Sequence, residues 1–159
     1  MATYREQSGL DNVEFRLGEI EHLPVAAASV DVVISNCVIN FSPDKPQVWH
    51  EIARVLQPGG RVSVSDIAIL KPLPQALQES IEALVGCVAR AVLVEEIKEM
   101  VHSAGLTNTQ FKYKSDFIDT LFDSQDPLFQ EIINQLTPCN NLSDFVTSLT
   151  ISAHKPSTI

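Results

Sequence analysis

The sequence predicts an α/β domain built as a three-layer sandwich, and three observations lead to that fold. Short apolar runs alternate along the chain with segments of helical periodicity, in the order β, β, α, β, α, α, β, α, β. The chain has 159 residues, close to the size of one domain, so we treat residues 1–159 as a single unit. Hydrophobic residues make up 45% of it, which is enough apolar material for a packed core.

Two strands are predicted in the first 40 residues. Residues 13–17 alternate apolar and polar side chains with a period of two, which is typical of a short strand that ends at Gly18. Residues 30–35 form a continuous β-branched run, which indicates a central parallel strand covered on both faces. The carboxyl ends of these strands are therefore candidate positions for ligand-binding residues.

The rest of the chain continues the alternation. A helix is predicted to begin near Pro46 and to end at the Pro-Gly-Gly turn of residues 58–60. Gly105 ends a later helix that begins at Val94. The remaining predicted elements are strands at 62–67, 111–113 and 149–153 and helices at 74–84 and 127–136.

The charge balance argues against nucleic acid or an anionic membrane surface as the main partner. Eleven basic residues against twenty acidic ones give a net charge of −9, and no Lys/Arg cluster is present to neutralise phosphates. The first residues lack the apolar core of a signal peptide, and no apolar run approaches the roughly 18 residues of a membrane span. We therefore expect a cytoplasmic protein whose partners are small molecules or proteins.

The three cysteines, Cys37, Cys87 and Cys139, are odd in number and far apart, which suits reduced thiols better than a disulfide framework. Taken alone, each is best interpreted as a small buried hydrophobic residue. The alternative is that two of them converge as thiolates on a soft, thiophilic centre. Histidines at metal-ligand spacing and Cys-x-x-Cys pairs are lacking, which argues against a zinc site.

Several polar side chains come directly after predicted strands, where open α/β sheets bind ligands. Glu19 and Glu21 follow the first strand, and Glu19 is suited to accept a hydrogen bond from an adenine amino group. A solvated acidic turn is the alternative interpretation of this segment. Asn36 and Cys37 follow the second strand, and Asp66, near the end of a third strand, either faces the ligand edge or caps a loop.

Residues 12–25, followed by residues 29–45, closely resemble arsenite methyltransferases, a family that uses S-adenosylmethionine. The most specific part is residues 35–40, with the sequence SNCVIN, and residues 86–89, with the sequence GCVA, support it. The resemblance covers roughly residues 11–106. It implies the Rossmann-like fold of class I methyltransferases and an enzyme that acts on trivalent arsenicals.

The resemblance also implies roles for individual residues. Cys37 and Cys87 match two of the thiolates that hold trivalent arsenic in the family. These thiolates leave the arsenic lone pair available to attack the sulfonium methyl group, so catalysis is chiefly positioning. The positions beside the cofactor are Glu19, Ile20 and Glu21 near the adenine, and Asn36 and Val38 near the methionine part.

Two other functions stay open at this point. A class I methyltransferase for another small molecule, such as a quinone or sterol precursor, would make Cys37 incidental. A non-catalytic remnant would bind metalloids through its thiols or serve as an oligomerisation module.

The resemblance further implies that part of the fold would precede Met1. The glycine-rich first motif, the ribose-binding acidic residue and a third arsenic-binding cysteine all belong there, so we expect this chain alone to bind S-adenosylmethionine weakly. In the class I strand order 3-2-1-4-5-7-6, the first two strands would be missing. That leaves residues 13–17 without a neighbour and residues 30–35 with an open edge, which favours a homo-oligomer formed through that edge.

Overall fold

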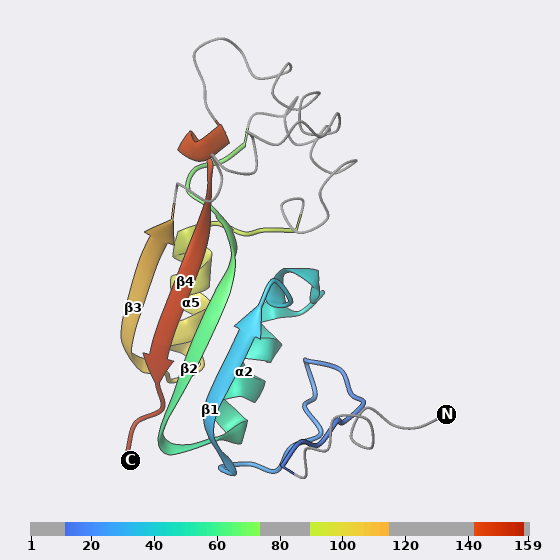
Figure 1. Cartoon of the computed structure of the whole chain (residues 1–159). Helices are drawn as coiled ribbons and strands as arrows, with labels where there is room; N and C mark the ends of the chain where they lie inside the picture. Colours follow the sequence, from blue (N-terminus) through green and yellow to red (C-terminus); the bar gives the residue numbers. More distant parts are fainter. Residues whose placement is uncertain (1–11, 74–89, 115–141, 158–159) are drawn as a thin grey trace.

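The computed structural model describes residues 12–73, 90–114 and 142–157, which form a mixed four-stranded sheet with helices packed on it (Figure 1). The order in the sheet is β1-β2-β4-β3, with β1 parallel to β2 and β4 antiparallel to both of its neighbours. This matches the 4-5-7-6 end of the predicted strand order. The strands are β1 (Val30–Asn36), β2 (Leu56–Ile69), β3 (Thr107–Lys114) and β4 (Val146–His154).

Two α-helices, α2 (Lys45–Val55) and α5 (Val94–Ser103), begin and end close to their predicted positions. The Asp44 side chain caps α2 by accepting a hydrogen bond from the Gln47 N–H at 3.1 Å. Gly105, at φ +78°, follows α5 in the left-handed conformation that ends many helices. Two short 3₁₀ turns, η1 (Ile39–Phe41) and η2 (Leu142–Asp144), follow β1 and precede β4.

The core lies between the two helices and one face of β2 and β4. Helices α2 and α5 contact each other over this face, and Trp49 on α2 is only 1% exposed. The α/β fold class is thus confirmed. The strand residues buried in this core are Leu56, Val62, Val64, Ala68, Leu149, Ile151 and Ala153.

The opposite face of the sheet is less buried and more polar than the core face. Across β2 and β4 it presents half-buried hydroxyl side chains at Ser63, Ser65, Thr150 and Ser152. On β1 it presents Ile34, which is 79% exposed, so the expectation that this strand is covered on both faces is wrong for the described residues. The helices predicted at 74–84 and 127–136 lie outside those residues, which show two of the three predicted layers.

The strand predicted at residues 13–17 is wrong, because this segment has no strand conformation. Phe15 and Leu17 are exposed, and the Arg16 side chain donates to the Pro24 carbonyl at 2.8 Å. An alternating pattern produces a strand only where a neighbouring strand supplies hydrogen bonds. Within the described residues this segment has no such neighbour.

The first residues of β2 give a test of close packing. A Cβ atom at Gly60 would lie 2.8 Å from the Gln57 carbonyl oxygen and 3.1 Å from the Asp31 carbonyl oxygen. Gly60→Ala should therefore lower the free energy of unfolding by about 1–3 kcal/mol in urea denaturation, because backbone must move to make room. Gly105→Ala is the control: it has open space and only an unfavourable φ, with an expected cost of about 1 kcal/mol. A smaller cost at Gly60 than at Gly105 would contradict this account.

Candidate functional site

A pocket of about 290 Å³ lies beside the carboxyl end of β1, between that strand, α2 and the loop that contains Ile20. Its walls are mostly apolar, and Ser35 and Asn36 are the lining residues whose side chains can form hydrogen bonds. Three of the five predicted cofactor residues, Ile20, Asn36 and Val38, line it together. The other lining residues are Leu23, Val33, Ile34, Ser35, Ile39, Val48 and Ile52.

Cys37 lies between two residues that line this pocket, Asn36 and Val38. It is exposed, and its Sγ is 3.8 Å from Asn36 Oδ1. Its backbone N–H donates to the Ser65 carbonyl on β2 at 3.0 Å, and its φ is +53°. The thiol therefore stands at the carboxyl edge of the sheet. The second predicted thiol, Cys87, and also Cys139 lie outside the described residues.

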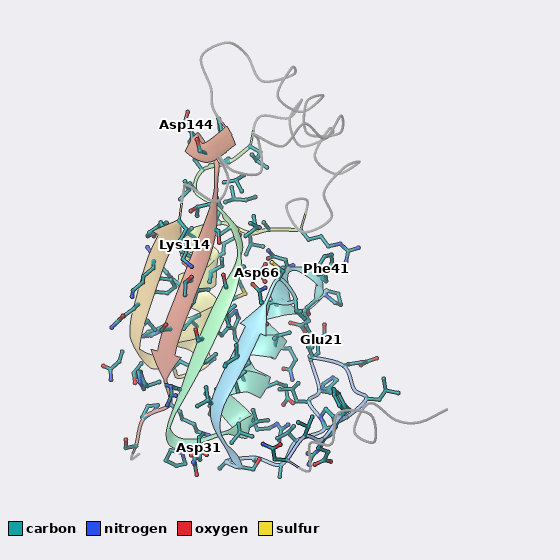
Figure 2. The ribbon with its side chains drawn as sticks, in the orientation of Figure 1. Glu21, Asp31, Phe41, Asp66, Lys114 and Asp144 are labelled. Atoms are coloured by element: carbon teal, nitrogen blue, oxygen red, sulfur yellow. The ribbon has the colours of Figure 1, made fainter. Side chains whose placement is uncertain are left out.

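The two predicted acidic residues of the loop, Glu19 and Glu21, are placed differently from Ile20. Glu19 is exposed, and its carbonyl accepts a hydrogen bond from the His22 N–H at 3.1 Å. The carboxylate of Glu21, which is labelled in Figure 2, accepts a hydrogen bond from Ser42 Oγ. Glu21 thus ties the loop to the start of α2, and neither carboxylate is among the residues that line the pocket.

A partly buried ion pair on α2, which sequence patterns did not predict, fixes the same loop. Arg54 binds Glu51 through two hydrogen bonds, of 2.6 and 2.8 Å, and donates to the carbonyls of Leu23 and Val25. The Leu23 N–H donates to the Glu51 carboxylate at 2.7 Å. These hydrogen bonds, chiefly the one from Arg54, lower the pKa of Glu51, which is 7% exposed. In the sequence the only signal is an i,i+3 charge pair, which surface helices also show.

A second buried cluster joins the turn after β1 to β2. Figure 2 shows Asp66 on β2 beside this turn. The Asp66 carboxylate accepts hydrogen bonds from the Asn40 backbone N–H at 3.3 Å and from its side-chain Nδ2 at 2.8 Å. Burial raises the pKa of Asp66, and its hydrogen bonds with backbone N–H groups partly offset that effect. Of the two predicted roles for Asp66, the structure shows the loop cap.

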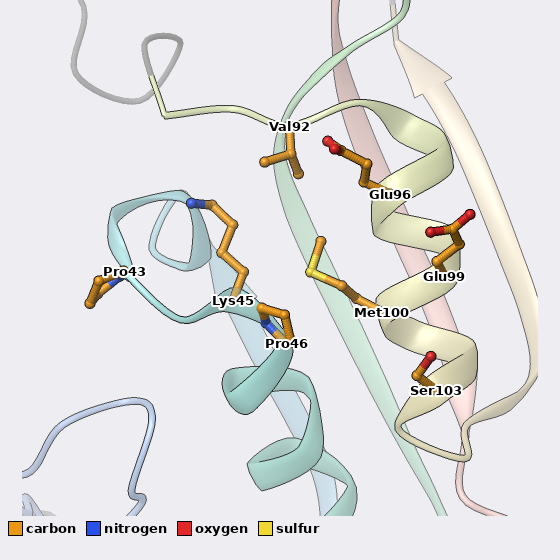
Figure 3. Close-up of a pocket in the computed structure, with 8 residues that line it drawn as sticks. All are labelled: Pro43, Lys45, Pro46, Val92, Glu96, Glu99, Met100 and Ser103. Carbon is orange, nitrogen blue, oxygen red and sulfur yellow. The ribbon is translucent and has the colours of Figure 1, made fainter.

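A larger pocket of about 480 Å³ opens between the start of α2 and α5 (Figure 3). Met100 extends into it from α5, and Lys45 lines the facing wall. Burial and the nearby Arg90 lower the pKa of Lys45. A cavity of about 20 Å³ that also touches Lys45 and Met100 reaches Asn40 and Asp66, and this is room for about one water molecule. Within the described ranges, no three His, Cys, Asp or Glu side chains gather as a metal site would require.

Comparison with known proteins identifies the family. A family model described as a methyltransferase domain matches residues 1–105. The chain belongs to this methyltransferase family. The methyltransferase domain also shares the Rossmann-like fold of solved relatives, as predicted from the sequence.

Two curated relatives are arsenite methyltransferases. The protein of Halobacterium salinarum is 42% identical over 146 residues, which is 92% of this chain and 34% of the relative. The human protein is 37% identical over 97 residues, which is 59% of this chain and 26% of the relative. The methyltransferase domain described here therefore spans about a third or less of the length of these relatives.

Solved structures show the same fold. An arsenic(III) S-adenosylmethionine methyltransferase from Chlamydomonas reinhardtii is 29% identical with a TM-score of 0.63, covering 87% of this chain and 43% of that chain. Phosphoethanolamine N-methyltransferase 2 of Haemonchus contortus, in complex with S-adenosyl-L-methionine, is 15% identical with a TM-score of 0.66, covering 87% and 36%. In the part of the chain that the structure describes, no helix is long and apolar enough to cross a membrane.

The Glu51–Arg54 pair gives a pH-dependent test of how the loop is held. Glu51→Gln should lower the free energy of unfolding by about 1–3 kcal/mol at neutral pH, because a buried hydrogen-bonded charge is lost. Since the pKa of Glu51 is lowered on folding, its contribution is present above the ordinary pKa of Glu and is lost as the pH falls through the folded value. Urea denaturation of both proteins should therefore give a difference that shrinks in acid.

Glu95→Gln is the matched control for this measurement. Glu95 pairs with Lys98 at the same i,i+3 spacing on α5, but its side chain is 77% exposed. We expect a change below about 0.5 kcal/mol, because exposed ion pairs contribute little. Equal effects at Glu51 and Glu95 would show that the buried pair does not hold the loop.

Proposed function

We propose that this domain functions in the S-adenosylmethionine-dependent methylation of trivalent arsenicals. The observation that carries the proposal is the position of Cys37 between two pocket-lining residues, Asn36 and Val38, at the carboxyl edge of β1. The 42% identity of this chain with an arsenite methyltransferase supports this assignment. A methyltransferase for a quinone or sterol would have no use for an exposed thiol at this position.

The thiol chemistry follows from the softness of sulfur. Thiolates bind trivalent arsenic as soft ligands, and we assign this role to Cys37 together with Cys87. Each As–S bond forms as a thiol displaces a hydroxyl group from arsenic, and the proton and hydroxyl leave as water. The lone pair stays on arsenic, so the chain needs no general base there and contributes chiefly by orienting the substrate.

The pocket beside β1 has the chemistry that parts of S-adenosylmethionine require. When bound, the cofactor supplies a methyl group on a positively charged sulfur. Ile20 offers apolar contact for the flat adenine ring, and the Asn36 amide, beside Val38, offers a donor and an acceptor for the polar methionine part. Glu19 and Glu21 remain assigned to the adenine end, where Glu21 contributes by holding the loop to Ser42.

We also propose that residues 1–159 form one cytoplasmic domain that self-associates through β1. Within the described residues β1 is an edge strand, and its unpaired backbone groups lie beside the exposed Ile34. An antiparallel pairing of two copies centred on Val33 would place Asp31 opposite Ser35. The one charged residue of β1 would then avoid its own copy, which supports a symmetric dimer.

The arsenic-binding proposal can be tested with phenylarsine oxide, which forms two As–S bonds with two thiols and releases one water molecule. The full chain should bind it tightly, with one arsenical per chain. Cys37→Ser and Cys87→Ser should each weaken binding about 100-fold or more in titration calorimetry, because the second thiol acts at a high effective concentration. Cys139→Ser is the matched control and should bind like the wild type. Equal binding by all four proteins would reject the paired site.

The self-association proposal can be tested by placing a charge on β1. Sedimentation velocity at micromolar concentration should show a dimer for the wild type and a monomer for Val32→Lys, because two cations would enter an apolar interface. Gln110→Lys, on the other edge strand β3, should leave the dimer unchanged. Circular dichroism checks that each variant is folded. A wild type that sediments as a folded monomer would rule out this interface.

A further inference from the structure

The turn that follows β1 holds a cysteine in an unfavourable backbone conformation. Cys37 has φ +53°, which lies in the left-handed region that residues other than glycine, Asn and Asp rarely adopt. Such a conformation costs free energy and persists only where the surrounding structure fixes it. The contacts that fix it at Cys37 therefore also fix the direction of the Cα–Cβ bond that carries the thiol.

Three consecutive residues of β2 supply those contacts. The Cys37 N–H donates to the Ser65 carbonyl at 3.0 Å, which holds the start of the turn. Three residues later, Asn40 donates its backbone N–H and its side-chain Nδ2 to Asp66, and Nδ2 also donates to the Ile67 carbonyl at 2.8 Å. Cys37 is thus held from both sides.

The second of these anchors is well shielded from water. Asn40 is 3% exposed and Asp66 is 6% exposed, so bulk solvent does not compete for their hydrogen bonds. The Arg90 side chain donates to the Phe41 carbonyl at 3.2 Å and adds a contact on the outer side of the same turn. The buried Asn40–Asp66 pair is therefore the side-chain anchor of this turn, beside the backbone hydrogen bond of Cys37 with Ser65.

We propose that Asn40 and Asp66 are positioning residues, which hold the Cys37 thiol in the orientation required for arsenic to bind two thiols. This inference rests on the proposed function, because it assigns the two residues to the same arsenic site. Neither residue is assigned a contact with the substrate. Their effect passes through the backbone of residues 37–40.

Two variants release the turn in different ways. Asp66→Asn keeps an oxygen for Asn40 Nδ2 and the Ile67 N–H, but its NH₂ group cannot accept the hydrogen bond from the Asn40 backbone N–H. Asn40→Ala removes the side-chain hydrogen bonds and keeps the backbone one. Asp31→Asn is the matched control, because it makes the same chemical change near the other end of β1, where Asp31 accepts a hydrogen bond from Gln57.

The first measurement compares a reaction that needs two thiols with one that needs a single thiol. Asp66→Asn and Asn40→Ala should weaken phenylarsine oxide binding about tenfold, whereas Asp31→Asn should not. The rate at which iodoacetamide alkylates Cys37, measured with Cys87 and Cys139 replaced by serine, should change less than twofold. General unfolding would instead alter both reactions, so the split between them identifies positioning.

The second measurement does not depend on arsenic. Hydrogen–deuterium exchange should be at least tenfold faster at the amides of residues 37–42 in Asp66→Asn and Asn40→Ala, with α2 and β2 unchanged. Wild-type protection of this turn in both variants, or undiminished phenylarsine oxide binding where Cys37→Ser abolishes it, would overturn the inference. If Cys37→Ser binds like the wild type, the proposed function fails, and the exchange data still decide whether the pair holds the turn.

Discussion

The parallel pairing of β1 with β2 is the interaction on which the candidate site depends. It aligns the carboxyl end of β1 with residues 65–67 of β2, so that the polypeptide leaving β1 meets hydrogen-bond acceptors as soon as the strand ends. Helices α2 and α5 pack on one face of β2 and hold this strand in place. An exposed turn can therefore be well defined, because its partners belong to the most buried strand pair in the described core.

Two separate anchors hold segments that border the pocket, and their electrostatics differ. The ionised Glu51 is stabilised by Arg54, whereas the ionised Asp66 is disfavoured by burial. Acid therefore removes a favourable interaction under the loop that contains Ile20, and burial lets Asp66 take up a proton at a higher pH than an exposed carboxyl group does.

Sequence patterns predicted those parts of the fold in which local chemistry and tertiary packing agree. The N-cap and proline near Pro46 and the glycine at Gly105 mark helix ends that the structure reproduces within a few residues. The strand predicted at residues 13–17 was wrong because an alternating pattern shows that a segment is suited to a strand. It does not show whether a neighbouring strand exists. Strand pairing is a non-local property, so a periodic segment alone does not determine it.

The candidate site was predictable to a similar degree. The position of Asn36 and Cys37 after a β-branched run was enough to place them at the ligand edge. The residues that support the site, Glu51 and Asn40, carry no such signal, because their roles depend on partners that only the folded chain brings within 3 Å. In the sequence, a charge pair or an amide that supports a site cannot be distinguished from one on an ordinary helix or turn.

The left-handed backbone at Cys37 has a consequence for how this sequence can change over time. Glycine would adopt φ +53° at the least cost, so random substitution filtered by folding alone would tend to replace the cysteine. A requirement for sulfur chemistry, such as the proposed arsenic site imposes, opposes that drift. Position 37 is therefore a place where selection for stability and selection for reactivity favour different amino acids, and the amino acid found there records which of them prevailed.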